Sequence, residues 1–493
     1  MKKKLFYFYI VLSAFLWTIL QSMRHVMSID AMEAVKWGEL LSFGTNKHPP
    51  LTGWLASAVY NFLGHNEVFI YILGQVCVII GFIYIYKLAK NFLSEEKAFC
   101  SVMILQACHY YTYSVVLDNF NCNIILLAFW PAVAYYFYKG INQERTKDWI
   151  TFGILTGLAF CGKYQIVFLI FALFLYLLIA DRQQFRKKGI YIAFLSGLAI
   201  ILPHIVWVWQ HDFFCLNYMT QRAGANEIHK SLLSNTIEPI FYCTKFLADQ
   251  ILASLGCIAF YAFTAIQAKN IKFKNGELPR NDRIFILSIA VIPVLAQAFL
   301  GLSTAHRVPG TWGSMMLGFL GIFLFTMFPI KFRENTFKFF TGLSFFVLGG
   351  SVLAIFAFLN LQNKMYISLP YEKIFPEINQ QWNLETDNAP LKYVAGDLGY
   401  IFAYRYYDKS HPEVILDTFG YKNPWANHQD ILESGAIIFS QDSEELDTIA
   451  KDRIRLLPKD YQTTPKLLDY KVCNKLNSCK DYSIFYAIIL PQK

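Results

Sequence analysis

Residues 68–86 read VFIYILGQVCVIIGFIYIY, a run of nineteen residues without one charged side chain. A helix rises about 1.5 Å per residue, so a run of this length spans a hydrocarbon core of about 30 Å. In lipid the backbone must satisfy its own hydrogen bonds, and a helix does so within one segment. We therefore predict that this stretch crosses a membrane as a helix.

Eight further blocks are nearly free of charge: Leu5–Leu20, Ile124–Tyr138, Ile166–Ala180, Gly189–Trp209, Phe246–Ala268, Ile284–Leu302, Met315–Ile330 and Phe339–Leu359. The chain is 55% hydrophobic and 16% charged, whereas soluble domains carry about 25% charged residues. Together with the alternation of basic loops along the chain, the pattern predicts about eleven transmembrane helices, a mainly α polytopic membrane protein, and the count includes the short segments on either side of Lys163. Because no small-residue cleavage pattern follows the first block, we expect that helix to be retained.

Basic residues gather in alternate loops: Lys2–Lys4, Lys87–Lys97, Lys139–Lys147, Arg182–Lys188, Lys269–Arg283 and Lys331–Lys338. Loops rich in Lys and Arg stay in the cytoplasm. The pattern predicts a multi-pass protein of a bacterial inner membrane, with a cytoplasmic N-terminus and a periplasmic C-terminus. These loops account for the net charge of +9, which gives no reason to expect nucleic acid binding.

The last 133 residues differ in composition from the rest of the chain. Residues 361–493 hold 15 Lys and Arg against 18 Asp and Glu, a net charge of −3. Four short apolar or alternating runs predict strands: Tyr393–Ala395, Val414–Leu416, Ala436–Phe439 and Ser483–Ile489. We predict a transmembrane catalytic domain over residues 1–360 and a small periplasmic α/β domain over 361–493.

Two of the ten cysteines, Cys473 and Cys479, lie close together in this polar tail. The sequence leaves a disulfide and two unpaired thiols as alternatives. The predicted periplasmic location favours the disulfide, because that compartment is oxidising.

Carboxylates stand at the predicted outer face after the first apolar block and again shortly before the block Ile124–Tyr138. Asp30 and Glu33 are spaced to share one face of a helix, and Asp118 is a second acidic point. Asp30 can serve as a general base on an acceptor hydroxyl or orient that hydroxyl. The alternative is an interfacial helix cap, a position that aspartate favours.

Cations are predicted on the same side. Lys47 and His48 precede Pro49 and Pro50, whose restricted backbone makes the segment rigid. Lys163 interrupts an apolar stretch and therefore needs a partner or a water-filled cavity, for which Asp118, Asp30 or a phosphate would serve. Further outer cations are Arg222, His306 and Arg307. Together they predict an anionic ligand such as a lipid phosphate, with ordinary headgroup binding by the membrane lipids as the alternative.

The chain has no phosphate-binding P-loop pattern, no metal-spaced Cys/His set and no nucleophile elbow. The sequence therefore gives no support to a P-loop nucleotide-binding protein, a Cys/His zinc site or a serine hydrolase.

The ordered set of motifs resembles the GT-C glycosyltransferase superfamily, in the branch of the protein O-mannosyltransferases and the aminoarabinose and galacturonic acid transferases of lipid A. The pieces are Asp30, His48-Pro49-Pro50-Leu51, Gly157-Leu158…Lys163-Tyr164, Pro203…Trp207…His211-Asp212 with Gln221-Arg222, and His306-Arg307…Trp312. The likeness runs through most of Leu5–Ile330. Two departures stand out: Ala31 follows Asp30 where the family usually has Glu, and Gly313 follows Trp312 where it has Pro.

The resemblance implies transfer of a sugar from a polyprenyl-phosphate donor, with inversion, to a lipid, glycan or protein acceptor on the periplasmic side. Asp30 would be the central acidic residue, with Asp118 second and Glu33 a candidate for the second acidic role. Residues expected to bind donor phosphate or substrate are Lys47, His48, Lys163, Tyr164, His211, Arg222, His306 and Arg307. Some members use a divalent metal, for which Asp30 and Asp118 are the candidate ligands, but no cofactor is required by the residues themselves.

Two other functions remain open from the sequence. A flippase or transporter for lipid-linked sugars predicts inverted repeats and interrupted helices at mid-bilayer, and no repeat stands out. A polysaccharide assembly factor needs no carboxylates opposite cations.

Overall fold

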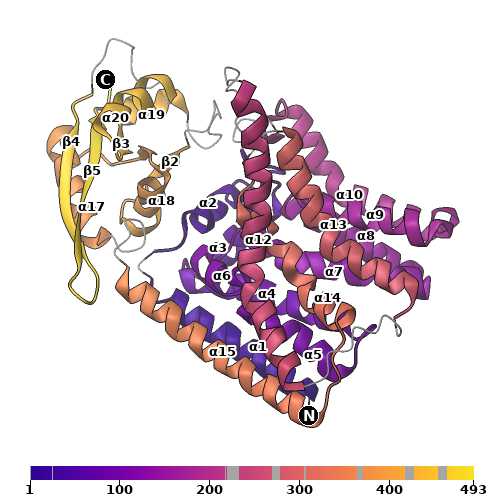
Figure 1. Cartoon of the computed structure of the whole chain (residues 1–493). Helices are drawn as coiled ribbons and strands as arrows, with labels where there is room; N and C mark the ends of the chain where they lie inside the picture. Colours follow the sequence, from indigo (N-terminus) through magenta and orange to yellow (C-terminus); the bar gives the residue numbers. More distant parts are fainter. Residues whose placement is uncertain are drawn as a thin grey trace. The chain divides into compact units, whose positions relative to one another are not determined.

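The computed structural model describes residues 2–24, 26–216, 218, 232–268, 278–304, 307–362, 370–416, 427–453 and 463–492. The chain divides into two compact units (Figure 1). The first comprises Met1–Gln21 and Trp37–Ile355, and the second comprises Ser22–Lys36 and Phe356–Lys493. The short segment that carries Asp30 and Glu33 is therefore grouped with the C-terminal residues.

Helices dominate the first unit, to which the elements below belong apart from most of α2 and the last residues of α15. In chain order they are α1 (Lys2–Gln21), α2 (Ile29–Gly38), α3 (Leu51–Phe62), α4 (Glu67–Ala89), α5 (Glu95–Met103), α6 (Tyr113–Asp118), α7 (Cys122–Gln143), α8 (Thr146–Gly162), α9 (Ile166–Ala180), α10 (Lys188–Gln210), α12 (Leu232–Ala268), α13 (Arg280–Thr304), α14 (Leu320–Met327) and α15 (Glu334–Leu361). Short 3-10 helices are η1 (Ile104–Ala107), η2 (His109–Tyr111), η3 (Arg182–Arg186) and η4 (Gly310–Phe319).

Eight helices of the described chain are long and apolar enough to cross a membrane, and the shorter apolar helix α9 adds a further candidate. The eight are α1, α4, α7, α10, the Ile237–Ala268 part of α12, α13, the continuous stretch Gly310–Met327, and α15. Each predicted apolar block overlaps one of these nine elements. The protein is a multi-pass membrane protein, while the predicted count of eleven spans is not confirmed.

Glycines let neighbouring helices approach closely. A Cβ on Gly81 of α4 would lie 2.3 Å from the carbonyl oxygen of Leu127 in α7, and one on Gly74 would lie 2.0 Å from that of Asn119. Small residues at such crossings are typical of membrane helix pairs, because dispersion contacts between backbones replace the hydrophobic effect there. The pair α4 and α7 thereby fixes the start of α7, where Asn121 caps the helix by accepting from the amides of Asn123 and Ile124.

The second unit is a mixed sheet with helices. Its strands are β1 (Tyr393–Gly396), β2 (Glu413–Ile415), β3 (Ala436–Ser440), β4 (Lys466–Cys473) and β5 (Cys479–Ile489), in the order β2-β1-β3-β5-β4. β1 runs parallel to β2 and β3, whereas β5 runs antiparallel to β3 and β4. The helical elements are α17 (Tyr371–Thr386), α18 (Leu398–Tyr407), α19 (His428–Ser434), α20 (Ser443–Thr448) and η5 (Ile449–Arg453).

The small α/β fold expected for the tail is confirmed. The four predicted strands correspond to β1, β2, β3 and β5, and the sequence prediction missed β4. Buried apolar side chains between the sheet and α20, among them Ile438, Leu446 and Ile489, form the core of this unit. Cys473 and Cys479 form a disulfide across the end of the β4–β5 hairpin, where they face each other in register.

Candidate active site

The Lys47-His48 segment is shaped by one threonine. The hydroxyl of Thr45 donates to the carbonyl of His48 (2.9 Å) and accepts from the amides of Lys47 (3.2 Å) and His48 (2.8 Å). A short side chain that bonds backbone groups within its own turn stabilises that turn. Pro49 and Pro50 then lead directly into α3, so the two functional candidates sit on a rigid link.

Lys47 is buried, with 6% of its surface exposed. Its ammonium lies 6.0 Å from the ring centroid of Trp37 and 5.7 Å from that of Tyr218. Rings within about 6 Å attract a cation through their electron-rich faces. A primary ammonium held between aromatic rings in a buried place can bind an anion strongly, because little water competes there.

His48 faces the start of α7. Its Nε2 lies 3.5 Å from the thiol of Cys122, and its ring centroid lies 5.5 Å from that of Trp37. The next residue, Asn123, accepts a hydrogen bond from the ammonium of Lys163. Two successive residues of α7 therefore bring His48 and Lys163 to one helix end.

Lys163 follows α8 directly and is extended, with φ −164° and ψ 137°. Only 5% of its surface is exposed, and its ammonium lies 5.2 Å from the ring centroid of Trp312. The hydroxyl of Thr52 in α3 donates to the carbonyl of Gly162 (3.1 Å). The Lys163 backbone is thus attached to the same loop and helix that position Lys47.

Tyr164 belongs to a chain of polar contacts behind the lysines. Its hydroxyl lies 2.8 Å from His204 Nε2 and 3.2 Å from the thiol of Cys215. His204 Nδ1 lies 2.6 Å from the carbonyl of Phe43, which can only accept. His204 therefore donates a hydrogen bond from Nδ1 and accepts one from the tyrosine hydroxyl at Nε2. These two hydrogen bonds link the end of α8 to the loop before Lys47.

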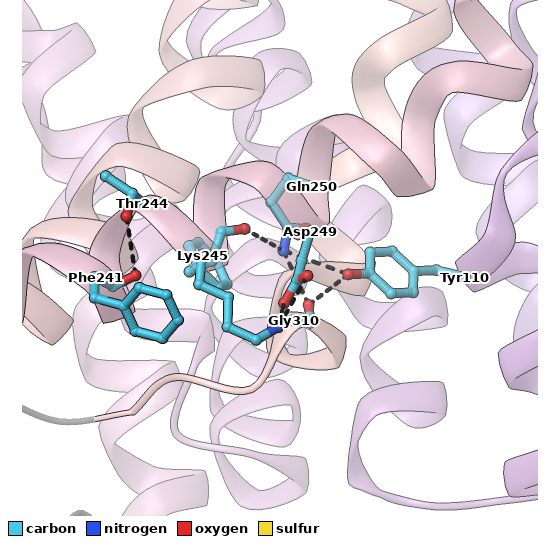
Figure 2. A network of polar contacts seen from close by, with 8 residues as sticks. Tyr110, Phe241, Thr244, Lys245, Asp249, Gln250 and Gly310 are labelled. Carbon is cyan, nitrogen blue, oxygen red and sulfur yellow. Dashed lines mark hydrogen bonds and ion pairs between the residues drawn. The ribbon is translucent and has the colours of Figure 1, made fainter. Parts of the chain in front are cut away.

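Figure 2 shows the contacts of Gly310, which begins η4. The first turn of this 3-10 helix, Gly310 to Trp312, is called here the loop that carries Trp312. The carbonyl of Gly310 accepts from the hydroxyl of Tyr110 (2.8 Å) and from Nε2 of Gln250 (3.0 Å). Gln165, two residues after Lys163, donates to the carbonyl of Trp312 (3.4 Å). A Cβ on Gly310 would lie 2.7 Å from the carboxylate of Asp249, so the loop backbone packs directly against α12.

The acidic segment lies in the second unit. Asp30 is exposed in the first turn of α2, and Glu33, one turn later, is 3% exposed. Lys36 is 2% exposed and its ammonium lies 2.5 Å from Glu413 of β2. The other oxygen of Glu413 lies 2.9 Å from the guanidinium of Arg405.

The chain entering α2 is fixed to the same unit, because the amide of Met27 donates to the hydroxyl of Tyr407 (2.8 Å). The orientation of the Asp30 helix therefore depends on α18 and β2.

The other predicted residues that the structure describes lie at or after the ends of other helices. Asp118 ends α6 and is half-buried, immediately before Asn119 with φ 57°. His211 follows α10, stacks on Trp207 at 4.2 Å and contacts its carbonyl at 2.8 Å. Arg307 is exposed. Arg222 and His306 lie outside the described residues.

A metal site does not stand out in the described part of the chain, where no three His, Cys, Asp or Glu side chains come together. The candidate ligands Asp30 and Asp118 belong to different units. The cations Lys47 and Lys163 have the opposite chemistry, since they suit an anion.

Several residues of this region carried no distinguishing signal in the sequence. Asn123, Gln165 and Gln250 are neutral amides in apolar helices or at their ends, a pattern shared by ordinary interhelical contacts. His204 was the most visible, because Pro203 and His204 interrupt the apolar run of α10.

The comparisons bear on the same region. A family model for dolichyl-phosphate-mannose-protein mannosyltransferases matches residues 47–207, from Lys47 to Trp207. A lipid A galacturonosyltransferase of Rhizobium johnstonii is 24% identical over 294 residues, 57% of this chain and 59% of the relative. An undecaprenyl phosphate-α-4-amino-4-deoxy-L-arabinose arabinosyl transferase of Proteus mirabilis is 22% identical over 347 residues, 66% of this chain and 57% of the relative.

An oligosaccharyltransferase structure from Archaeoglobus fulgidus aligns with 97% of this chain and 74% of its own, at 10% identity and a TM-score of 0.39. The aligned parts of the curated relatives are less than two thirds of their length. The sequence matches confirm the class to which the motifs pointed: this polytopic membrane protein is related to glycosyltransferases. More narrowly, its relatives lie in the GT-C superfamily, in the branch of the mannosyltransferases and lipid A sugar transferases.

Proposed function

We propose that the chain is a glycosyltransferase that moves a sugar from a polyprenyl-phosphate donor to lipid A, lipopolysaccharide or another envelope acceptor. The observation that carries the proposal is that two lysines of the region matched by the family model, Lys47 and Lys163, are buried. The ammonium of each lies beside an aromatic ring. The named activities of the relatives, on lipid A and from an undecaprenyl phosphate donor, support the same reaction class.

The chemistry asked of this site is the departure of a phosphate. In an inverting transfer, the acceptor oxygen bonds to the anomeric carbon as the bond from that carbon to the phosphate oxygen breaks. The electron pair leaves with the polyprenyl phosphate, whose negative charge grows in the transition state. Positioned cations stabilise such charge best in a site with little water. Lys47 and Lys163 would bind the phosphate, and the ring of Trp312 would keep the Lys163 ammonium from bulk water.

The acceptor proton needs a different group. Asp30 is exposed at the start of α2, where its carboxylate can accept the proton of a hydroxyl or orient the acceptor. A phosphate acceptor needs no strong base, and Asp30 would then have only the orienting role. The charge pattern of the loops supports a reaction on the periplasmic face of the inner membrane.

The test is sugar transfer in proteoliposomes. Purified protein receives radiolabelled polyprenyl-phosphate sugars and lipid A. Lys163→Met removes the ammonium at similar length, and Asp30→Asn removes the carboxylate charge. The matched controls are Lys147→Met and Asp481→Asn, both at exposed positions.

We expect each site variant to lower the transfer rate by about 100- to 1000-fold, the range for loss of one transition-state contact. The controls should transfer at the wild-type rate. Movement of the labelled lipid between leaflets without transfer from any donor would refute the proposal in favour of a flippase.

A further inference from the structure

A cavity of about 840 Å³ lies in the first unit, among helix ends that border the basic loops. Five cations line it: Lys2, Lys97, Arg283, Lys331 and Arg333. They come from the start of α1, from α5, from the start of α13 and from the link between α14 and α15. Two carboxylates, Glu96 and Glu334, share the lining, so its net charge is +3.

The two carboxylates are already engaged by lysines. Glu96 pairs with Lys2, and Glu334 lies 2.7 Å from Lys338, which is not part of the lining. The first pair holds the start of α1 against α5 and so closes one wall. The cavity as a whole therefore favours an anion, while its shape depends on an internal ion pair.

Apart from Ser94 and Thr326, the other lining side chains are apolar. Phe325 is buried, and Phe92, Phe332 and Phe337 are half-buried around the same space. The ammonium of Lys2 lies 5.6 Å from the ring centroid of Phe337. An occupant that matches this lining carries a negative headgroup together with an apolar body.

The expected level of the cavity in the membrane favours one kind of occupant. It lies where α14 ends at Met327, where α15 begins at Glu334 and where α13 begins at Arg280. The ends of membrane-length helices lie at the level of the lipid headgroups. Its volume is in the range of small-molecule sites, about 300–1,000 Å³, which exceeds the need of a single ion.

We propose that this cavity is a binding site for the phosphate headgroup of an anionic membrane phospholipid, on the side predicted to be cytoplasmic and distinct from the lysine region of the candidate active site. Basic pockets between membrane helices bind such headgroups through several Lys and Arg at once. The proposal does not depend on the glycosyltransferase activity.

Native mass spectrometry of the full chain in detergent tests it. The protein is titrated with phosphatidylglycerol, with zwitterionic phosphatidylcholine, or with inorganic phosphate. The site variant is Lys331→Gln with Arg333→Gln, two exposed residues of the lining. The matched control is Lys147→Gln with Arg186→Gln, two exposed cations outside the cavity and predicted on the same side.

We expect phosphatidylglycerol to bind about 30-fold more weakly to the site variant, because it loses two basic contacts of about 1 kcal/mol each. The control should keep wild-type binding, and phosphatidylcholine should bind all three proteins equally weakly. If the double variant fails to fold, Lys97→Gln replaces it, with an expected loss of about fivefold for its single contact.

Equal loss in the control variant would overturn the proposal, since the charge would then act only as ordinary surface attraction. Unchanged binding in the site variant would overturn it as well. Displacement of phosphatidylglycerol by inorganic phosphate at the same concentration would identify a soluble anion as the occupant and overturn the lipid assignment.

Discussion

The loop that carries Trp312 offers a sharp test, because two side chains bind the single carbonyl of Gly310. Tyr110→Phe deletes one hydroxyl at constant shape. Gln250→Leu deletes the other donor together with its Oε1 atom, which is buried and has no hydrogen-bond partner among the described residues. The two changes therefore remove hydrogen bonds to the loop while they keep the size of each side chain nearly constant.

The expected size follows from the contacts. A neutral hydrogen bond contributes about 1 kcal/mol net, which corresponds to about a fivefold change in an opening equilibrium when 1.4 kcal/mol is tenfold. Loss of both donors should open the loop about 30-fold more often, at about 2 kcal/mol. The Tyr110 hydroxyl also lies 3.4 Å from Gln250 Nε2, so the two effects should couple.

Hydrogen–deuterium exchange of the peptides over residues 308–316 measures the opening. We expect faster exchange in each variant and the fastest in the double variant. Tyr242→Phe, on the same helix and eight residues before Gln250, is the control and should exchange as the wild type does. The reasoning fails if the double variant exchanges as slowly as the wild type. A parallel transfer assay then reports whether an open loop lowers the rate.

Three further outcomes follow from other contacts. Glu413→Gln should lower the free energy of unfolding of the full chain by about 1–3 kcal/mol, because it removes the carboxylate that pairs with the buried Lys36. Glu444→Gln, at an exposed position in the first turn of α20, should leave the melting temperature nearly unchanged. Gly81→Ala should cost about 1–3 kcal/mol through its clash with the Leu127 carbonyl; Gly342→Ala, whose Cβ meets nothing within 4 Å, should be neutral in the same thermal melt. The hydrogen bond from Tyr393, followed by the one from Lys392, lowers the pKa of Asp430 below its usual range. The stabilisation from this carboxylate is therefore present above the unfolded pKa of about 3.9 and is lost as the pH falls through the lowered folded pKa. In thermal melts at a series of pH values, Asp430→Asn should reduce the loss of stability at acidic pH, and an unchanged loss would contradict the assignment.

Much of the membrane fold was accessible from local composition. The apolar runs predicted α4 and the other long helices, because a segment that crosses lipid must be predominantly apolar along its whole length. The count of spans was harder, since α8 and α9 have 17 and 15 residues and flank the polar Lys163-Tyr164 link. α9 was visible as the apolar block Ile166–Ala180, but both helices are shorter than the roughly 20 residues that a span usually needs.

The tail was predicted less completely. β3 is buried along its whole length, and such strands read as apolar runs. β4 alternates between half-buried and exposed residues at the edge of the sheet, and its Lys466-Leu-Leu-Asp start resembles a loop or helix. An edge strand depends on its partner more than on its own composition.

The candidate site was predictable by residue type and not by partner. Because Lys163 interrupts an apolar stretch, the sequence indicated that its charge needs a polar partner or water. Its role in binding donor phosphate stays a prediction. That Asn123 and Trp312 are among its neighbours required the tertiary structure. The grouping of Asp30 with the C-terminal residues was equally inaccessible, because pairing across hundreds of residues leaves no periodic signal.

This grouping has a consequence for the timing of biogenesis. Lys36 and Glu413 are 377 residues apart in the chain. At a synthesis rate of about 5–20 residues per second, Glu413 is made roughly 20 to 75 s after Lys36. Throughout that interval the acidic segment lacks the contact that later fixes it, while the helices between them are already being inserted. A nascent chain thus acquires its membrane helices first and the anchor of Asp30 near the end of translation, so premature termination before β2 would yield an inserted protein whose acidic segment is unanchored.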